Sequence, residues 1–140
     1  MVVYYFAYGS NMNHNQMKNR CKNIRFVCRA YLENYDFVYD GIGSKIFANI
    51  IPKNGSVVWG ALWEIDNNDL KRLDIHEGYP YEYIRKKVIV KDNNGKEYDA
   101  WVYLREPRKL GNPSEEYRKK VVEGARDCGL PEDYISKKLI

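Results

Sequence analysis

Glu77 is the residue whose type and position point most directly to chemistry. It ends segment 66–77, in which Leu70 and Leu73 mark an apolar stripe, and it lies on the same helical face as Leu70. A carboxylate directed at the core is costly unless it is paired or protonated. The C-terminal end of a helix also disfavours a further negative charge. Both effects predict a raised pKa, which suits a general acid–base catalyst.

The helical pattern alone favours a simpler interpretation of Glu77. A residue at a helix end can turn out to solvent or pair with a nearby Arg or Lys. His76 is the neighbouring candidate, but it falls on a different face of the helix. A lone histidine is more often a surface or hydrogen-bonded residue than a catalyst.

The second candidate is the loop Tyr8-Gly9-Ser10-Asn11, which directly follows an apolar segment. Glycine widens the accessible backbone geometry and Ser and Asn form local hydrogen bonds, so successive N–H groups can converge on a carboxylate. The pattern alone favours an ordinary turn in which Asn11 or Asn13 caps the next helix. The loop lacks the spacing and lysine of a P-loop, and the flanking glycines of a nucleophile elbow.

Ser10 is a nucleophile only in principle. The histidines of the sequence are His14 and His76, and neither supports a catalytic triad with Ser10. Covalent serine chemistry is therefore disfavoured.

Composition bounds the class of protein. The chain has 140 residues, of which 44% are hydrophobic and 30% charged, as expected for one domain spanning residues 1–140. Its apolar runs are too short for a membrane-spanning helix. The first residues lack the basic region and long apolar core of a secretory signal, which predicts a cytoplasmic location. The net charge of +4 is scattered rather than gathered in a basic block, so no nucleic-acid partner is expected.

The cysteines, Cys21, Cys28 and Cys128, form an odd set without a C-x-x-C pair. This spacing argues against a disulfide framework and against a zinc site. Buried or half-buried thiols in a reducing compartment are the favoured interpretation.

The sequence pattern predicts many strands joined by hairpins and few helices. Turn signals at 40–43 and 92–95 close two of the hairpins. This arrangement is typical of an α+β fold, with a closed or strongly coiled sheet on which helices pack. The expected strands lie at 2–8, 24–39, 45–51, 56–65, 82–91 and 96–104, with 24–39 as one long strand or two broken ones. The expected helices lie at 13–21, 66–77 and 114–128, with a short helical tail.

Segments spread along the chain resemble the γ-glutamylcyclotransferase superfamily, including its AIG2-like bacterial and plant members. The matching segments appear in the family's order. The resemblance implies a small mixed, largely antiparallel β-barrel with flanking short helices and a cavity, and no metal or organic cofactor. The segments are Tyr5-Phe6-Ala7-Tyr8-Gly9-Ser10-Asn11-Met12, Val58-Trp59-Gly60-Ala61-Leu62-Trp63, Leu73-Asp74-Ile75-His76-Glu77-Gly78, Pro113-Ser114-Glu115-Glu116-Tyr117 and Gly129-Leu130-Pro131-Glu132-Asp133-Tyr134.

The resemblance also implies roles for individual residues. The loop from Tyr8 to Asn11 grips a γ-glutamyl group largely through its backbone, Glu77 is the acid–base catalyst, and Tyr117 lines the substrate site. From the residues alone, Tyr117 is a core residue on the stripe that contains Val121. The implied reaction is attack of the substrate's own α-amine on its γ-carbonyl, which yields 5-oxoproline and a free amine or amino acid.

The identity of the leaving amine stays open. The first loop looks like that of the branch that acts on γ-glutamyl amino acids. Residues 77–85 look more like bacterial AIG2-like proteins and the branch that acts on γ-glutamylamines. The glutathione-specific branch is less similar at the first loop. A pathway enzyme that removes a γ-glutamyl protecting group is a further alternative. So is a non-catalytic ligand-binding or protein-interaction module on the same barrel. The sequence specifies no oligomeric state.

Overall fold

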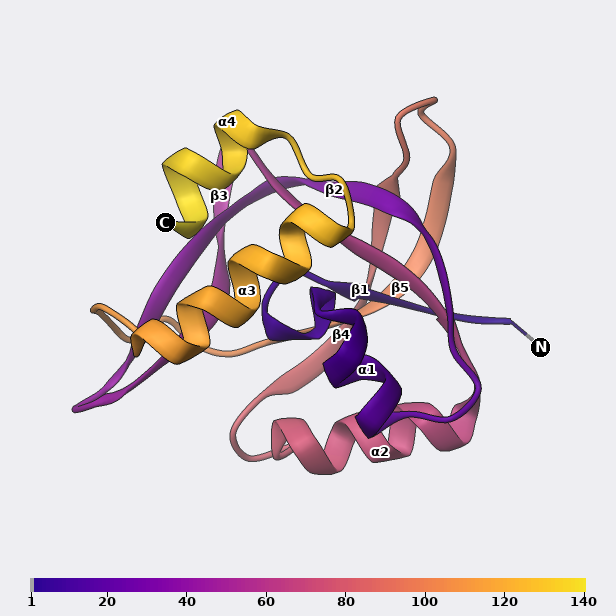
Figure 1. Ribbon diagram of the computed structural model, residues 1–140, viewed down its shortest axis with the longest axis horizontal. Helices are drawn as coiled ribbons and strands as arrows, with labels where there is room; N and C mark the ends of the chain where they lie inside the picture. Colours follow the sequence, from indigo (N-terminus) through magenta and orange to yellow (C-terminus); the bar gives the residue numbers. More distant parts are fainter. Residues whose placement is uncertain (1) are drawn as a thin grey trace.

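A computed structural model describes residues 2–140 and shows a closed β-barrel with helices on its outside (Figure 1). Within these residues, the sheet order is β3-β1-β5-β4-β2-β6, and β2 also pairs with β3, which closes a five-stranded ring. β1 and β5 are parallel and the other pairs are antiparallel. The predicted mixed, largely antiparallel barrel is confirmed. The strands are β1 (Val3–Ala7), β2 (Arg25–Ile42), β3 (Lys45–Ile65), β4 (Ile84–Lys91), β5 (Glu97–Leu104) and β6 (Lys109–Leu110).

The long β2–β3 hairpin differs in two details from the sequence-based expectation. β3 is one strand rather than two, because β2 pairs with it on both sides of a register shift, at Glu33↔Val57 and at Tyr35↔Pro52. The turn lies at the end of the predicted 40–43 range: β2 continues to Ile42, and the chain reverses at Gly43 and Ser44, where the φ of 61° at Gly43 suits glycine.

The helices cover one side of the barrel, with α1 between α2 and α3 (Figure 1). A 3-10 turn, Ser10–Met12, joins β1 to α1. Of the helices in residues 2–140, none is long and apolar enough to cross a lipid bilayer. The helices are α1 (His14–Arg20), α2 (Asn67–Glu77), α3 (Glu115–Asp127) and α4 (Glu132–Tyr134), which continues as a π-helical turn, Ile135–Leu139.

Both ends of α2 follow the sequence signals. The Asp66 carboxylate caps the first turn by accepting a hydrogen bond from the Asp69 N–H at 2.7 Å. Gly78 ends the helix in the left-handed conformation, with φ of 67°. These two signals place Glu77 as the last residue of α2.

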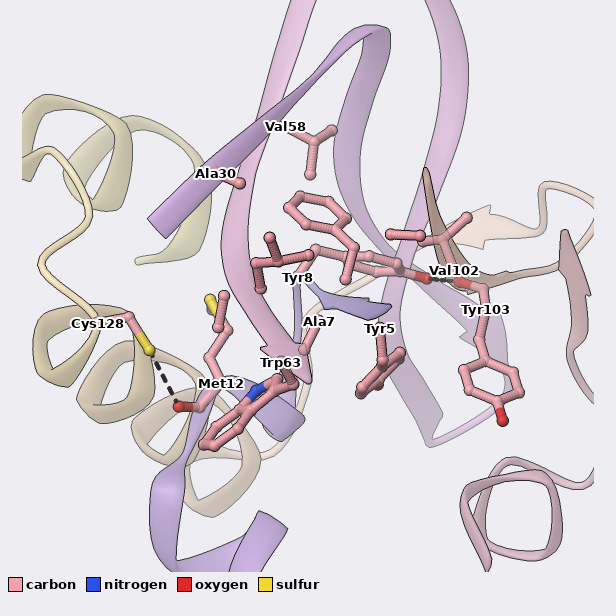
Figure 2. Close-up of a cluster of buried hydrophobic side chains, with 14 of the residues drawn as sticks. Tyr5, Ala7, Tyr8, Met12, Ala30, Val58, Trp63, Val102, Tyr103 and Cys128 are labelled. Carbon is pink, nitrogen blue, oxygen red and sulfur yellow. Dashed lines mark hydrogen bonds between the residues drawn. The ribbon is translucent and has the colours of Figure 1, made fainter. Parts of the chain in front are cut away.

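β1 runs through the middle of the buried core (Figure 2). The end of β1 packs directly against the backbone of β3 at Gly60. A Cβ atom at Gly60 would lie only 2.3 Å from the carbonyl oxygen of Ala7, so there is no room for a side chain. Just beyond β1, the Tyr8 hydroxyl donates to the carbonyl of Tyr103 at 2.5 Å, and the Trp63 indole donates to the carbonyl of Asn11 at 3.1 Å. The packing of the barrel therefore fixes where the loop after β1 begins.

Candidate active site

A cavity of about 880 Å³ opens beside the end of β1. Its walls come from the loop after β1, the end of α2, the tip of the β2–β3 hairpin and the first turn of α3. The structure thereby brings together all the candidate residues that the sequence analysis singled out. They are Tyr8, Gly9, Ser10, Asn11, Glu77 and Tyr117.

Glu77 is half-buried in the wall of this cavity. Burial raises the pKa of its carboxyl group to about 7, against the opposing effect of the nearby Arg20 and Arg105 cations. Within residues 2–140, no Lys or Arg approaches Glu77 closely enough to form an ion pair. Glu77 is therefore a carboxyl group that gains and loses its proton near neutral pH.

The Asn11 side chain organises the loop rather than pointing free into the cavity. Its Nδ2 donates to the Tyr5 hydroxyl at 2.9 Å, and its Oδ1 accepts from Gln16 at 2.8 Å and from Arg20 at 3.1 Å. The helix cap is Asn13, whose Oδ1 accepts from the Gln16 N–H. Of the two caps that the sequence allowed, the structure shows Asn13.

Gly9 and Ser10 form the floor of the cavity. A Cβ on Gly9 would lie 3.0 Å from the Cβ of Ala48 and 3.5 Å from the hydroxyl of Tyr117, so a side chain there would fill the space. The Ser10 hydroxyl accepts from Gln16 Nε2 at 2.7 Å. The first hydrogen bond of the turn is donated by Met12 to Gly9, so the N–H groups of Ser10 and Asn11 precede it and have no partner within the turn.

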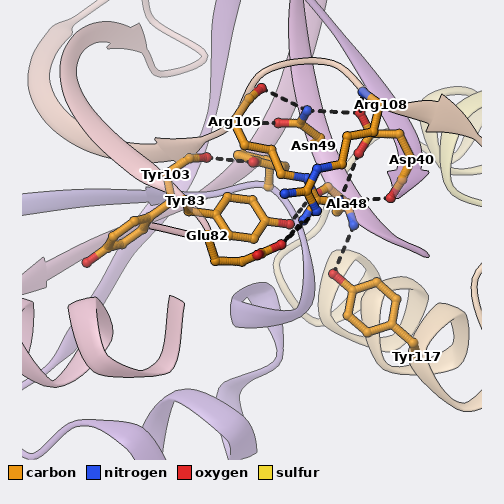
Figure 3. A network of polar contacts seen from close by, with 10 residues as sticks. Asp40, Ala48, Asn49, Glu82, Tyr83, Tyr103, Arg105, Arg108 and Tyr117 are labelled. Carbon is orange, nitrogen blue, oxygen red and sulfur yellow. Dashed lines mark hydrogen bonds and ion pairs between the residues drawn. The ribbon is translucent and has the colours of Figure 1, made fainter. Parts of the chain in front are cut away.

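Two tyrosines form hydrogen bonds with the backbone of a single residue of β3, Ala48 (Figure 3). The Tyr117 hydroxyl accepts from the Ala48 N–H at 3.2 Å, and the Tyr83 hydroxyl donates to the Ala48 carbonyl at 2.8 Å. Burial raises the pKa of Tyr117 to about 12 and that of Tyr83 further. Both hydroxyls are therefore protonated at neutral pH.

Sequence reasoning did not single out Tyr83 or the cationic residues of the cavity. Tyr83 lies just before β4, in a stretch where a strand pattern gives no sign of a function. The cavity is lined by more positive than negative side chains, which predicts a preference for anionic ligands. The positive side chains are Arg20, Lys45, Arg105, Arg108 and Lys120, the carboxylates are Glu77 and Glu82, and His76 adds a titratable ring.

Within residues 2–140, no three or more His, Cys, Asp or Glu side chains come together in a way that would hold a metal ion. The arrangement instead combines a carboxyl group titrating near neutrality with protonated hydroxyls and with backbone N–H groups that have no partner within their own turn. Such a site can transfer protons and stabilise negative charge on a bound anion.

The chain and its fold have known counterparts. Residues 57–138 match the model of the AIG2-like family. The γ-glutamylcyclotransferase of Homo sapiens is 31% identical over 95% of this chain and 75% of its own length. The chain belongs to this family. The Mus musculus γ-glutamylcyclotransferase is 30% identical over the same shares of the two chains.

Solved structures agree with this assignment. A structure named as a γ-glutamyl cyclotransferase superposes with a TM-score of 0.91 at 30% identity, covering 98% of this chain and 86% of that one. A structure of an uncharacterized Homo sapiens protein superposes with a TM-score of 0.90 at 31% identity, covering 97% and 85%. The family's barrel therefore extends over nearly the whole of this chain.

Proposed function

We propose that this chain is a γ-glutamylcyclotransferase-type enzyme that converts a γ-glutamyl group into 5-oxoproline and releases the attached amine or amino acid. One observation carries the proposal: the Glu77 carboxyl group, with a pKa of about 7, lines one cavity with the Gly9–Asn11 loop and Tyr117. The names of the relatives supply the reaction class.

The proposed reaction exchanges one C–N bond for another and removes two protons from the attacking nitrogen. Glu77 in its anionic form takes the first proton from the substrate's α-ammonium group and passes it to solvent. The free amine attacks the γ-carbonyl carbon, and the carbonyl oxygen becomes an oxyanion. Glu77 then takes the second proton from the attacking nitrogen and delivers it to the leaving nitrogen as the C–N bond to the leaving amine breaks. The released amine takes up a further proton from water. Because the substrate contains both nucleophile and electrophile, the proposed reaction uses no cofactor.

Other cavity residues bind and orient the substrate in this proposal. The N–H groups of Ser10 and Asn11 and the Tyr117 hydroxyl supply donors for the α-carboxylate and the oxyanion. Arg20, which Asn11 holds at 3.1 Å, adds positive charge beside that loop. Holding a flexible γ-glutamyl chain in a folded conformation supplies much of the rate by itself.

Glu77→Gln tests the catalytic assignment. The amide keeps the size of the side chain but cannot take up a proton, so release of 5-oxoproline from γ-glutamyl amino acids is expected to fall by roughly 10²–10⁴-fold. Substrate binding, measured by calorimetry, is expected to persist. Glu97→Gln is the matched control, because Glu97 is exposed on β5 and lies outside the cavity.

The outcome separates two interpretations. Full turnover by the Glu77→Gln protein would remove Glu77 from the mechanism. If the parent protein binds γ-glutamyl compounds but releases no 5-oxoproline from any of a broad panel, the barrel is a ligand-binding module instead.

We also infer a cytoplasmic location. Cys21, Cys28 and Cys128 are free thiols, as expected for a protein in a reducing compartment. Detection of the tagged protein in a fractionated cell tests this inference.

A further inference from the structure

Two arginines flank Glu77 from different parts of the fold. Arg20 ends α1 and is tied to the loop after β1, whereas Arg105 directly follows β5. Both line the cavity, and both favour the anionic form of Glu77. If Arg20 and the loop serve the glutamyl part of a substrate, the Arg105 side of the cavity is left for the group that departs.

The Arg105 guanidinium is buried and built into a network (Figure 3). Its Nη2 donates to the Asp40 Oδ1 at 2.9 Å and to the Asp40 carbonyl at 2.8 Å, and the side chain is only 3% exposed. The guanidinium also stacks over the Tyr83 ring, 4.7 Å from its centre. Its Nε has no hydrogen-bond partner among residues 2–140. This cation is thus rigidly placed and retains donor capacity.

Asp40 is itself fixed on every side. It is fully buried, and its Oδ2 accepts from Asn49 Nδ2 and from the backbone N–H of Arg108, each at 3.0 Å. A buried ion pair of this kind is weak as a source of stability, because removing two charges from water costs about as much as their attraction returns. The barrel therefore gains little from Arg105, and a role toward a ligand explains its presence better.

Glu82 shows that the two arginines can bind a carboxylate. Its Oε1 accepts from Arg105 Nη1 at 3.2 Å and from Arg108 Nη1 at 2.8 Å. Unlike the arginine beneath it, the Glu82 side chain is 52% exposed and lies in the connection between α2 and β4. A half-exposed carboxylate thus occupies a two-arginine site at the wall of the cavity.

From this geometry we propose that Arg105 and Arg108 form a subsite for a carboxylate on the leaving group, and that Glu82 occupies this subsite until the substrate displaces it. The proposal rests on the proposed cyclisation. It makes γ-glutamyl amino acids, whose leaving group is anionic, better substrates than γ-glutamylamines, whose leaving group is not. The excess of positive side chains in the cavity acts in the same direction.

A pair of substrates that differ in one carboxylate tests the proposal. γ-Glutamyl-L-alanine and γ-glutamylethylamide have the same scissile bond, and the second lacks the alanine carboxylate. The parent protein is expected to show a kcat/KM for γ-glutamyl-L-alanine about 10-fold or more above that for the ethylamide. Equal values, or a preference for the ethylamide, would overturn the proposal.

Variants at the subsite are expected to act on one substrate only. Arg108→Gln should raise the KM for γ-glutamyl-L-alanine about 10-fold and leave that for the ethylamide unchanged, because one charged donor is lost. Glu82→Gln should lower the KM for γ-glutamyl-L-alanine alone, because the competing carboxylate is gone. Lys109→Gln is the control, since it removes the neighbouring charge on an exposed residue outside the cavity.

A purely structural role for Arg108 and Glu82 predicts a different result. Both variants would then lose thermal stability and change the two KM values equally, which contradicts the proposal. Arg105→Gln, followed by thermal unfolding and kinetics together, extends the test to the buried arginine, because the amide carries no positive charge. Retained preference for γ-glutamyl-L-alanine in a folded Arg105→Gln protein would place the subsite on Arg108 alone and contradict the paired site.

Failure of the proposed reaction is distinguishable from failure of the subsite. If the parent releases 5-oxoproline from neither compound, the cyclisation is wrong, and calorimetry with the same two compounds still tests recognition. About 10-fold tighter binding of γ-glutamyl-L-alanine supports the subsite. Equal binding, or none, contradicts it.

Discussion

The carboxyl group of Glu77 keeps its proton at pH values where an exposed carboxylate has lost it, because the cavity wall replaces much of the water around it. This property arises because a glutamate stands at a position of α2 where the apolar stripe predicts an apolar residue. Where Leu70 and Leu73 bury methyl groups, Glu77 presents an ionisable group on the same side of α2. A residue that violates the pattern of its own helix is the kind that sequence analysis can find.

The raised pKa of Glu77 makes stability depend on pH in a definite direction. The folded protein holds this proton up to a pH of about 7, and the unfolded chain releases it near 4.5. Between these values the folded state binds more protons, so the free energy of unfolding falls as pH rises. Glu77→Gln removes the effect. Its stability relative to the parent is therefore expected to increase by about 2 kcal/mol between pH 5 and pH 8.

Urea denaturation of both proteins at the two pH values measures this difference. All other titrating groups are shared, so they cancel in the comparison. Glu97→Gln, on the exposed face of β5, should show the same difference from the parent at both pH values. A pH-independent difference for Glu77→Gln would mean that its carboxyl group titrates normally.

Arg105 illustrates what residue-level analysis of a sequence misses. Its partner Asp40 lies on another strand, and the two meet only because β2 and β5 belong to one closed barrel. Nothing in the local pattern around either residue indicates this pairing. The position of Glu82 over the two arginines is equally invisible, because the contact depends on the path of the α2–β4 connection.

At the scale of elements, α3 is seated directly on the loop that forms the cavity floor. Gly124 of α3 touches the backbone there, since a Cβ would lie 2.5 Å from Asn13 N and 2.7 Å from Met12 C. Tyr117 lies about two helical turns earlier on the same face. The close contact at Gly124 therefore sets the depth at which Tyr117 enters the cavity.

Gly124→Ala tests this contact. Helix propensity alone would make the alanine variant about 1 kcal/mol more stable. The added methyl group would overlap the backbone of Met12 and Asn13, and such overpacking costs about 1–3 kcal/mol. This cost exceeds the gain in helix propensity if α3 has to move outward. We expect lower thermal stability and a raised KM, because Tyr117 moves with α3. Glu123→Ala, at an exposed position of the same helix, should change neither. A stabilised Gly124→Ala protein with unchanged KM would contradict the contact.

The ends of some elements are determined by residues within the element itself, whereas other elements exist only because their strands pair with distant strands. The ends of α2 were predictable because a capping carboxylate and a closing glycine act within one turn of the helix. The continuity of β3 was not, because Pro52 and Gly55 read as an interruption and only pairing with β2 carries the strand through them. The two-residue strand β6 likewise exists only through its register with Asp40 and Gly41.

At the scale of the whole molecule, the C-terminal segment seals one side of the core. Ile135 and Leu139 are fully buried, and the Leu139 carbonyl accepts from the Tyr39 hydroxyl of β2 at 2.9 Å. The resemblance matched residues 129–134 to the C-terminal region of the family, and composition alone indicated only a single domain. The burial of the final turn required the closed barrel to be known.

Ile135→Ala is expected to lower the free energy of unfolding by about 3 kcal/mol, because it opens a cavity in a core that relaxes only partly. Ile140→Ala is the matched control, since Ile140 is 63% exposed. Its effect should stay within about 0.5 kcal/mol. Urea unfolding monitored by circular dichroism gives both values, and equal effects would show that the tail does not seal the core.

The central position of β1 also has a consequence for how the protein is made. Val3 pairs with Ile65 and Tyr5 with Trp101, so β1 can pair only after these downstream segments have been synthesised. Bringing such distant segments together is slow compared with folding of a local helical hairpin. A nascent chain that ends at Gly95 still lacks β5 on one side of β1 and the helix that carries Tyr117. The cavity that Glu77 lines therefore forms only after β5 and α3 have been synthesised.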